Sequence, residues 1–169
     1  MTEKYAAEEL FGENRDEFVQ WVPHCAEIGM RCLSVGPRTA TMIVPYRDEL
    51  VGDPERGVVF GGVITTLLDQ AGGAATLCSL TEIAPIATID LRIDYLRAAE
   101  PGCDLTGSAE CYKRTRSVAF VRGRAWDRSE DDPFAHFIAT YMLGSSAGEH
   151  PLRSLTEGPG TPGEGGASS

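Results

Sequence analysis

Paired cysteines and metal ligands are scarce in this sequence. Its five cysteines form no C-x-x-C pair, and its three histidines do not stand beside them at the spacing of a metal site. The odd number of cysteines also gives no reason to expect a framework of disulfides. We therefore expect no metal and no other cofactor, and we expect reduced, mostly buried thiols in a cytoplasmic protein.

Positive charge and long apolar runs are scarce as well. Fifteen Lys and Arg residues stand against 25 Asp and Glu residues, which gives a net charge of -10. A nucleic-acid-binding domain needs a basic surface, so nucleic acid is not expected as a partner. The most apolar window, residues 61–80, contains Asp69 and Gln70, and the N-terminus is acidic where a signal peptide is basic. No membrane association is expected either.

The length of 169 residues suits one globular domain. Asn14 and Glu17 have the spacing of a capping box, and Pro23 is expected to end the helix that they begin. The end of the chain is rich in glycine and proline and has little to bury, which predicts disorder. The expected parts are an N-terminal helix in residues 1–23, a folded domain in residues 24–145 and a disordered tail in residues 146–169.

The pattern of the middle of the chain predicts an α+β domain. Residues 61–80 are apolar or small on nearly every side, which is typical of a helix surrounded by protein, and Gly72-Gly73 within it would let a neighbour pack closely. Runs of adjacent strands after this helix favour an antiparallel sheet wrapped around it. The expected strands are residues 24–35 and 39–45, joined as a hairpin, and then residues 88–95, 103–113, 118–127 and 134–143.

The start of the predicted central helix carries the most informative chemistry. Gly61 and Gly62 open the helix, where free backbone N–H groups could polarise a substrate carbonyl that glycine allows to come close. Asp69 lies two turns further on in an apolar segment, where a carboxylate is costly unless it is hydrogen-bonded, faces a cleft or does chemistry. The plainer alternatives are a structural acid and a tight entry into the helix.

In this order and spacing, the motifs resemble the hotdog-fold acyl-CoA thioesterases of the phenylacetate-degradation type. The matching features are the glycine pair, Asp69 as the acid on the helix, and Thr88 at the start of the strand TIDLRIDYLRAAEPG. The resemblance implies that Asp69 is the general base or nucleophile. It further implies that Thr88 holds the water or the carboxylate and that Gly61 binds the oxyanion. In such a family the site is shared across a homodimer, and a homotetramer is the other assembly expected.

Two positions depart from the family pattern. Phe60 stands where the family has a histidine, so it can contribute only apolar contact with the substrate. Phe60 and Gly62 are the substrate-binding residues expected at the helix opening. Asp53 stands where the family has an asparagine, and a second carboxylate near Asp69 would raise the pKa of one of the two. These departures leave open the alternative of a non-catalytic protein that binds acyl-CoA; a dehydratase or hydratase on the same fold is the third reading.

Local positive charge indicates where coenzyme A would bind. Residues 92–128 contain eight basic and five acidic residues, although the chain as a whole is acidic. Arginine can bind phosphates in a bidentate manner, so Arg97, Arg114 and Arg116 are the candidates for contact with the coenzyme A of the substrate; ordinary solvated strand charges are the alternative. His24 and His136 fall in strand-like runs and are expected to be packing or surface residues.

Overall fold

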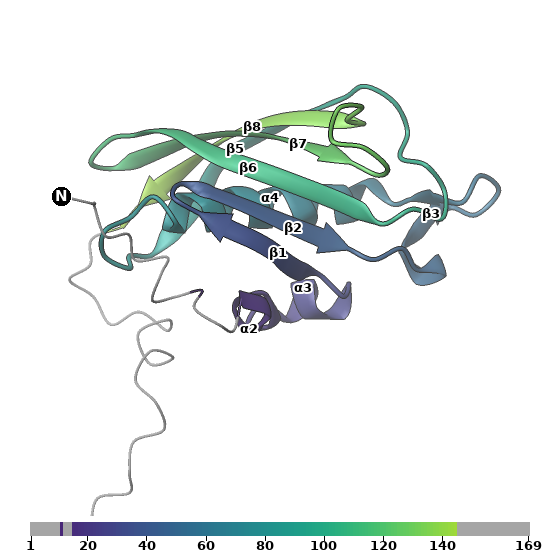
Figure 1. Cartoon of the computed structure of the whole chain (residues 1–169), viewed down its shortest axis with the longest axis horizontal. Coiled ribbons are helices and arrows are strands. Elements are labelled where there is room, and N and C mark those ends of the chain that lie inside the picture. Colours follow the sequence, from purple (N-terminus) through teal and green to yellow (C-terminus); the bar gives the residue numbers. More distant parts are fainter. Residues whose placement is uncertain (1–10, 12–14, 145–169) are drawn as a thin grey trace, which may run out of the picture.

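The computed structural model of the protein describes Phe11 and residues 15–144 (Figure 1). The helices in this part are α2 (Arg15–Gln20), α3 (Pro23–Glu27), the 3-10 helix η1 (Asp48–Leu50) and α4 (Gly61–Leu77). The strands are β1 (Arg31–Gly36), β2 (Thr39–Val44), β3 (Val51–Asp53), β4 (Val58–Val59), β5 (Ile86–Tyr95), β6 (Leu105–Arg114), β7 (Val118–Trp126) and β8 (Ala135–Leu143). The predicted cap Asn14 and the predicted tail lie outside the described residues.

Six of these strands form one antiparallel sheet in the order β1-β2-β6-β7-β8-β5. Helix α4 packs against one face, and Figure 1 shows the sheet curling over it. Gly107 of β6 permits the close approach, because an added Cβ there would lie 3.0 Å from Cγ of Leu67. Leu67 and Leu68 are completely buried in this contact. The expected α+β architecture, an antiparallel sheet wrapped around a long central helix, is confirmed.

Burial alternates along the strands as a sheet with one covered face requires. In β8 the buried side chains point toward α4 and their neighbours toward solvent; the buried set is Ala135, Phe137, Ala139 and Tyr141. In β5 the alternation is interrupted, because the register with β8 shifts between Thr88 and Asp90. This bulge turns the Thr88 side chain to the α4 side, and Leu91 follows on that side after the bulge.

The segment around Pro23 differs from the prediction. Residues 24–35 are not one strand, since Pro23–Glu27 form helix α3 and β1 begins only at Arg31. Pro23 therefore begins a helix instead of ending one, which agrees with the preference of proline for the first turn. Cys25 and Ile28, three residues apart, are both buried and fix α3 against the core. The helix brings His24 to a position that no strand would give it.

Helix α4 ends at Leu77, three residues before the predicted end. The Leu80 N–H donates to the Leu77 carbonyl (3.0 Å), and the Ser79 hydroxyl donates to the Thr76 carbonyl (2.7 Å). These i to i-3 bonds satisfy carbonyls of the last turn and stop the helix. Within the described part of the chain, no helix has both the length and the apolarity that a membrane crossing requires.

Candidate active site

Two hydroxyl groups of the sheet contact Asp69. Thr88 donates to its Oδ1 (2.8 Å), and the Tyr141 hydroxyl lies 2.9 Å from the Asp69 carbonyl oxygen and 3.3 Å from Oδ1. Among the described residues, no side chain or backbone group donates to Oδ2. One carboxylate oxygen is thus fixed by the sheet, and the other is available to accept a proton.

The sequence did not reveal Tyr141, although one signal pointed toward it. This residue is 2% exposed and reaches α4 from β8 at Gly72, where an added Cβ would overlap its hydroxyl. The glycine pair was expected to admit a close neighbour, and that expectation is confirmed. Burial raises the pKa of the Tyr141 hydroxyl, and the Asp69 charge raises it further, so this group remains a hydrogen-bond donor.

Replacing Gly72 with alanine tests whether this close approach supports the site. The new methyl group would push Tyr141 away from Asp69, and overpacking of this kind costs about 1–3 kcal/mol. We expect Gly72→Ala to lower the unfolding free energy and to lower the catalytic rate. Gly73→Ala is the control, since its Cβ would meet Cδ1 of Ile86 at 3.5 Å, an ordinary contact. Urea unfolding that finds both variants equally stable would contradict the prediction.

A cavity of about 410 Å³ opens beside Asp69. It is bounded by α3, by the middle of α4 and by β5; its lining residues are Val22, His24, Cys25, Thr65, Thr66, Asp69, Gln70, Thr88 and Leu91. The structure therefore brings the two predicted residues Asp69 and Thr88 together in one cavity. Cys25 is an unsuitable nucleophile, because burial, followed by the charge of Asp69, raises the pKa of its thiol to about 11.

The glycine end of α4 is a separate region of the same chain. Among the described residues, the N–H groups of Gly61 and Gly62 donate no hydrogen bond to the protein. The Phe60 side chain is 61% exposed, and its ring lies so close to Gly62 that an added Cβ would overlap it. The Tyr95 hydroxyl lies 3.8 Å from the place where a Cβ of Gly61 would stand. Gly61 precedes Asp69 by eight residues, about 12 Å along a helix.

Asp53 does not pair with Asp69 in the described structure. It lies in the β3–β4 hairpin, where its Oδ1 accepts a hydrogen bond from the Arg56 N–H (3.3 Å), and it is absent from the lining of the Asp69 cavity. Asp53 and Asp69 therefore do not meet within the described part of one chain. The backbone explains the difference, because the hairpin packs against Phe60 at the start of α4, two helical turns from Asp69.

Arg97 also differs from its expected role as a phosphate ligand. Its Nη1 and Nη2 make a bidentate pair with Asp127 (2.7 and 2.8 Å), and Nη2 also lies 3.3 Å from Asp132. This guanidinium therefore fixes one loop to another instead of presenting free charge. Arg114, the last residue of β6, and Arg116, in the β6–β7 turn, are both exposed. The Leu143 N–H joins this turn to β8 by donating to the Ser117 carbonyl. The turn lies at the end of the sheet where β5 begins.

The Arg97–Asp127 pair has a testable effect on stability. The Asp127 side chain is 1% exposed, and the hydrogen bonds from Arg97 hold the pKa of its carboxyl well below its usual range. Asp127→Asn removes the buried half of this network and leaves Arg97 with the exposed Asp132 as its charged neighbour, so it should cost about 2–3 kcal/mol at pH 7. Because the carboxyl pKa is lower in the folded than in the unfolded protein, the ionised Asp127 stabilises the fold at pH values above its unfolded pKa of about 4. This stabilisation is lost as the pH falls from there toward the folded-state pKa.

Urea unfolding at pH 7 and pH 3 checks this prediction. The difference between wild type and Asp127→Asn should be large at pH 7 and smaller at pH 3. Asp94→Asn is the control, since its pair with Arg92 is exposed and should contribute less than about 1 kcal/mol. Equal stabilities of wild type and Asp127→Asn at pH 7 would show that the pair is not structural.

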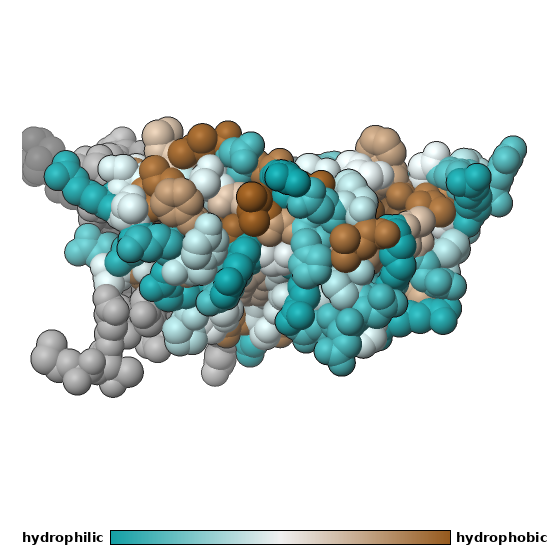
Figure 2. Space-filling model, turned by 90° about the horizontal axis from the view of Figure 1, so that it is seen from above, coloured by the Kyte–Doolittle hydropathy of each residue, from teal (hydrophilic) through white to brown (hydrophobic). Residues whose placement is uncertain are grey.

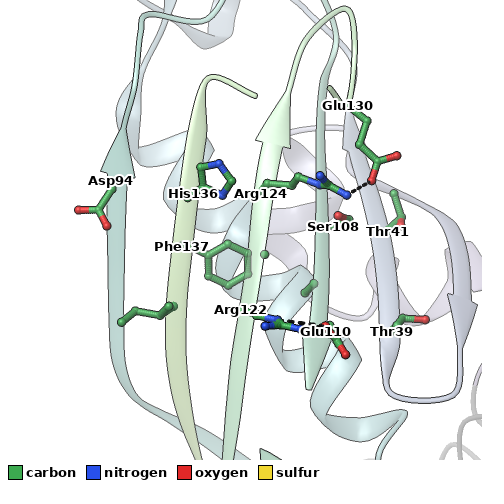
Figure 3. A pocket seen from close by; sticks show the side chains of 13 residues that line it. Thr39, Thr41, Asp94, Ser108, Glu110, Arg122, Arg124, Glu130, His136 and Phe137 are labelled. Atoms are coloured by element: carbon green, nitrogen blue, oxygen red, sulfur yellow. Dashed lines mark hydrogen bonds and ion pairs between the residues drawn. The ribbon is translucent and has the colours of Figure 1, made fainter. Parts of the chain in front are cut away.

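A larger groove, of about 620 Å³, lies on the opposite face of the sheet (Figure 3). Its charges are already paired, with Arg122 bound to Glu110 (2.9 Å) and Arg124 to Glu130 (2.6 Å). Seen from above, the surface shows apolar patches between polar ones (Figure 2). We therefore assign the chemistry to the smaller cavity, which contains the Asp69 carboxylate and its donor Thr88.

Comparison with known proteins identifies relatives of this chain. Residues 56–133 match the family model of the Thioesterase superfamily. A Pseudomonas aeruginosa protein of known crystal structure is 39% identical with a TM-score of 0.70, and the match covers 79% of this chain and 98% of that one. The medium/long-chain acyl-CoA thioesterase YigI of Escherichia coli K12 is 29% identical over 75% of this chain and 89% of its own length.

Two further matches are shorter or more distant. A Halobacterium salinarum protein is 44% identical over 59 residues, which is 33% of this chain and 39% of that protein. The Escherichia coli PaaI protein from the phenylacetic acid degradation operon is 14% identical, with a TM-score of 0.70 over 82% of this chain and 96% of PaaI, and so shares the fold.

The fold and the matches define a hotdog-fold protein of the thioesterase class. The chain belongs to the thioesterase superfamily, as its sequence resemblance predicted. Family membership supports a thioesterase-type function and hydrolase activity in general.

Proposed function

We propose that this protein hydrolyses acyl-CoA thioesters to a free acid and coenzyme A. The observation that carries the proposal is the Asp69 carboxylate, fixed at Oδ1 by the Thr88 hydroxyl (2.8 Å) and facing a cavity of about 410 Å³. A carboxylate with one oxygen fixed and the other unbonded suits a general base that acts on water. The similarity to YigI, an acyl-CoA thioesterase, supports the substrate class.

The reaction needs only water and groups of the protein. Asp69 accepts one proton from the water while the water oxygen attacks the thioester carbonyl carbon. The carbonyl electrons move to oxygen, where an N–H group at the start of α4 stabilises the charge. The C–S bond then breaks and its electron pair leaves with sulfur, which takes the proton from Asp69. The same carboxylate acting as a nucleophile is the other route open to this arrangement.

One chain cannot supply both the base and the oxyanion donor. Gly61 and Asp69 are separated by about 12 Å along α4, too far for both to touch one carbonyl group. β5 is an edge strand of ten residues, and an edge of that length invites pairing with another chain. We propose that two subunits pair through β5, either as a homodimer or as part of a homotetramer. This pairing places Gly61 of one subunit beside Asp69 of its partner.

Exposed apolar side chains near the end of β5 support the same assembly. Tyr95 and Leu96 are 52% and 58% exposed, and Phe60 lies at the same end of α4. A partner subunit would cover this surface and would place Phe60 where the acyl-CoA enters. Arg114 and Arg116 are the candidates for the phosphates of coenzyme A, since no salt bridge within the described residues engages them.

Phe60 favours a second candidate function, binding of acyl-CoA without hydrolysis. An aromatic ring at the helix opening adds apolar contact but no hydrogen-bond donor, so it aids substrate and transition state about equally. Release of free thiol from a panel of acyl-CoAs, measured beside their effect on the melting temperature, separates the two functions. Thiol release supports the hydrolase. Thermal stabilisation without release supports the binding protein.

A further inference from the structure

His24 lies in the Asp69 cavity with a defined hydrogen-bond arrangement. Its Nε2 is 3.3 Å from Oγ1 of Thr66, and that hydroxyl is 2.9 Å from the Gly62 carbonyl oxygen. Thr66 has a single hydroxyl hydrogen, which it donates to the carbonyl, so its oxygen accepts from the Nε2–H of His24. In the neutral imidazole, Nδ1 then carries the lone pair, and within the described residues no group donates to it.

Other polar groups that line the cavity are hydrogen-bond acceptors as well. The Thr65 hydroxyl donates to the Gly61 carbonyl (3.1 Å) and so offers only acceptor sites to the cavity. Oδ2 of Asp69 is an acceptor as well, and Gln70 is the single lining amide. A cavity rich in acceptors suits a ligand with two hydrogens to donate. Water is the ligand of that kind which hydrolysis requires.

We propose that His24 Nδ1 and Asp69 Oδ2 together hold the nucleophilic water by its two hydrogens. This inference rests on the proposed hydrolase function. Fixing both hydrogens leaves a lone pair of the water oxygen directed at the thioester carbonyl, which is the orientation that attack needs. One proton passes to Asp69, and the other stays on the oxygen and becomes the hydroxyl hydrogen of the acid product. His24 touches the reacting water and is therefore a catalytic residue.

The role makes activity sensitive to protonation of His24, because an imidazolium has no acceptor lone pair. Among the described residues, few titratable groups line the cavity with His24. Asp69 of α4 is the one charged lining residue, and Cys25 of α3 is neutral because burial raises the pKa of its thiol to about 11. β5 contributes only Thr88 and Leu91 to the lining. Activity should therefore require the neutral imidazole, in which Nδ1 keeps its lone pair.

Two replacements of His24 and one matched control test the inference. His24→Phe removes the acceptor and should lower kcat about ten-fold or more, with KM changed less than about three-fold. His24→Gln keeps a carbonyl acceptor that cannot be protonated under these conditions, so it should retain more of kcat than His24→Phe and change the dependence of the rate on pH. His136→Phe, at an exposed position on the outer face of the sheet, should change neither kcat nor KM.

Thiol release from a cleaved acyl-CoA, followed from pH 5 to 9, gives kcat and KM for each variant. If the wild type hydrolyses and Asp69→Asn does not, but both His24 variants keep the wild-type kcat and pH profile, the inference is overturned and the hydrolase stands. If both variants lose kcat together with melting temperature and keep the wild-type pH profile, His24 is structural and the inference is likewise overturned. If the wild type releases no thiol, the proposed function fails, and this inference fails with it.

Discussion

Asp69→Asn should reduce thioester hydrolysis by about 100-fold to 10,000-fold, the usual contribution of a general base. Asparagine has the same shape and can still accept the Thr88 hydroxyl bond at 2.8 Å, but it cannot take a proton from water. The cavity and its substrate contacts remain, so KM should change little. The melting temperature should stay within a few degrees, because the replacement removes a charge and no packing.

Asp131→Asn is the control for this experiment. Asp131 lies in the loop between β7 and β8, is exposed, and makes no salt bridge among the described residues. Its replacement should leave kcat and KM unchanged. An Asp69→Asn protein that keeps its rate would show that the base lies elsewhere, and one that unfolds would show that Asp69 is a structural acid.

The fold was predictable because local pattern and tertiary burial coincide. The central helix is apolar or small on nearly every side, and the sheet covers it. A run of adjacent strands was expected after this helix, and β5, β6, β7 and β8 follow it in the chain. The region around Pro23 was not predictable in this way. A short apolar run fits a strand or a helix equally well, and the burial of Cys25 and Ile28 against the core decides for the helix.

The site was predictable only where a residue conflicts with its local surroundings. Asp69 is conspicuous as a charge in an apolar helix, whereas Thr88 is an ordinary strand residue and was found through the family resemblance alone. Tyr141 lies 72 positions from Asp69 in the sequence, and no local sequence pattern indicates the hydrogen bond between them. Counting charges also misjudged Arg97, because its partner Asp127 is 30 positions away and becomes a neighbour only in the fold.

Gly61→Pro should reduce the rate by about 100-fold to 1,000-fold, the usual loss when one oxyanion donor is removed. Proline deletes the N–H group at the first helical position, where helices accept proline well. Phe60 has ψ 133°, the extended conformation that a residue before proline needs. Gly61→Ala is the control, since it keeps the N–H group and its Cβ would meet the Tyr95 hydroxyl at 3.8 Å. It should remain active.

Combining the two defects tests whether the site is shared between subunits. In a mixed dimer of Asp69→Asn and Gly61→Pro chains, one site carries both defects and the other carries neither. When equal amounts of the two chains pair at random, half of the dimers are mixed, and one of the two sites in each mixed dimer is intact. About a quarter of the wild-type activity should therefore return after co-expression or co-refolding. Each variant alone stays nearly inactive. If no activity returns although mixed dimers are present by mass spectrometry, base and oxyanion donor act within one chain, and the model of a site shared through β5 is wrong.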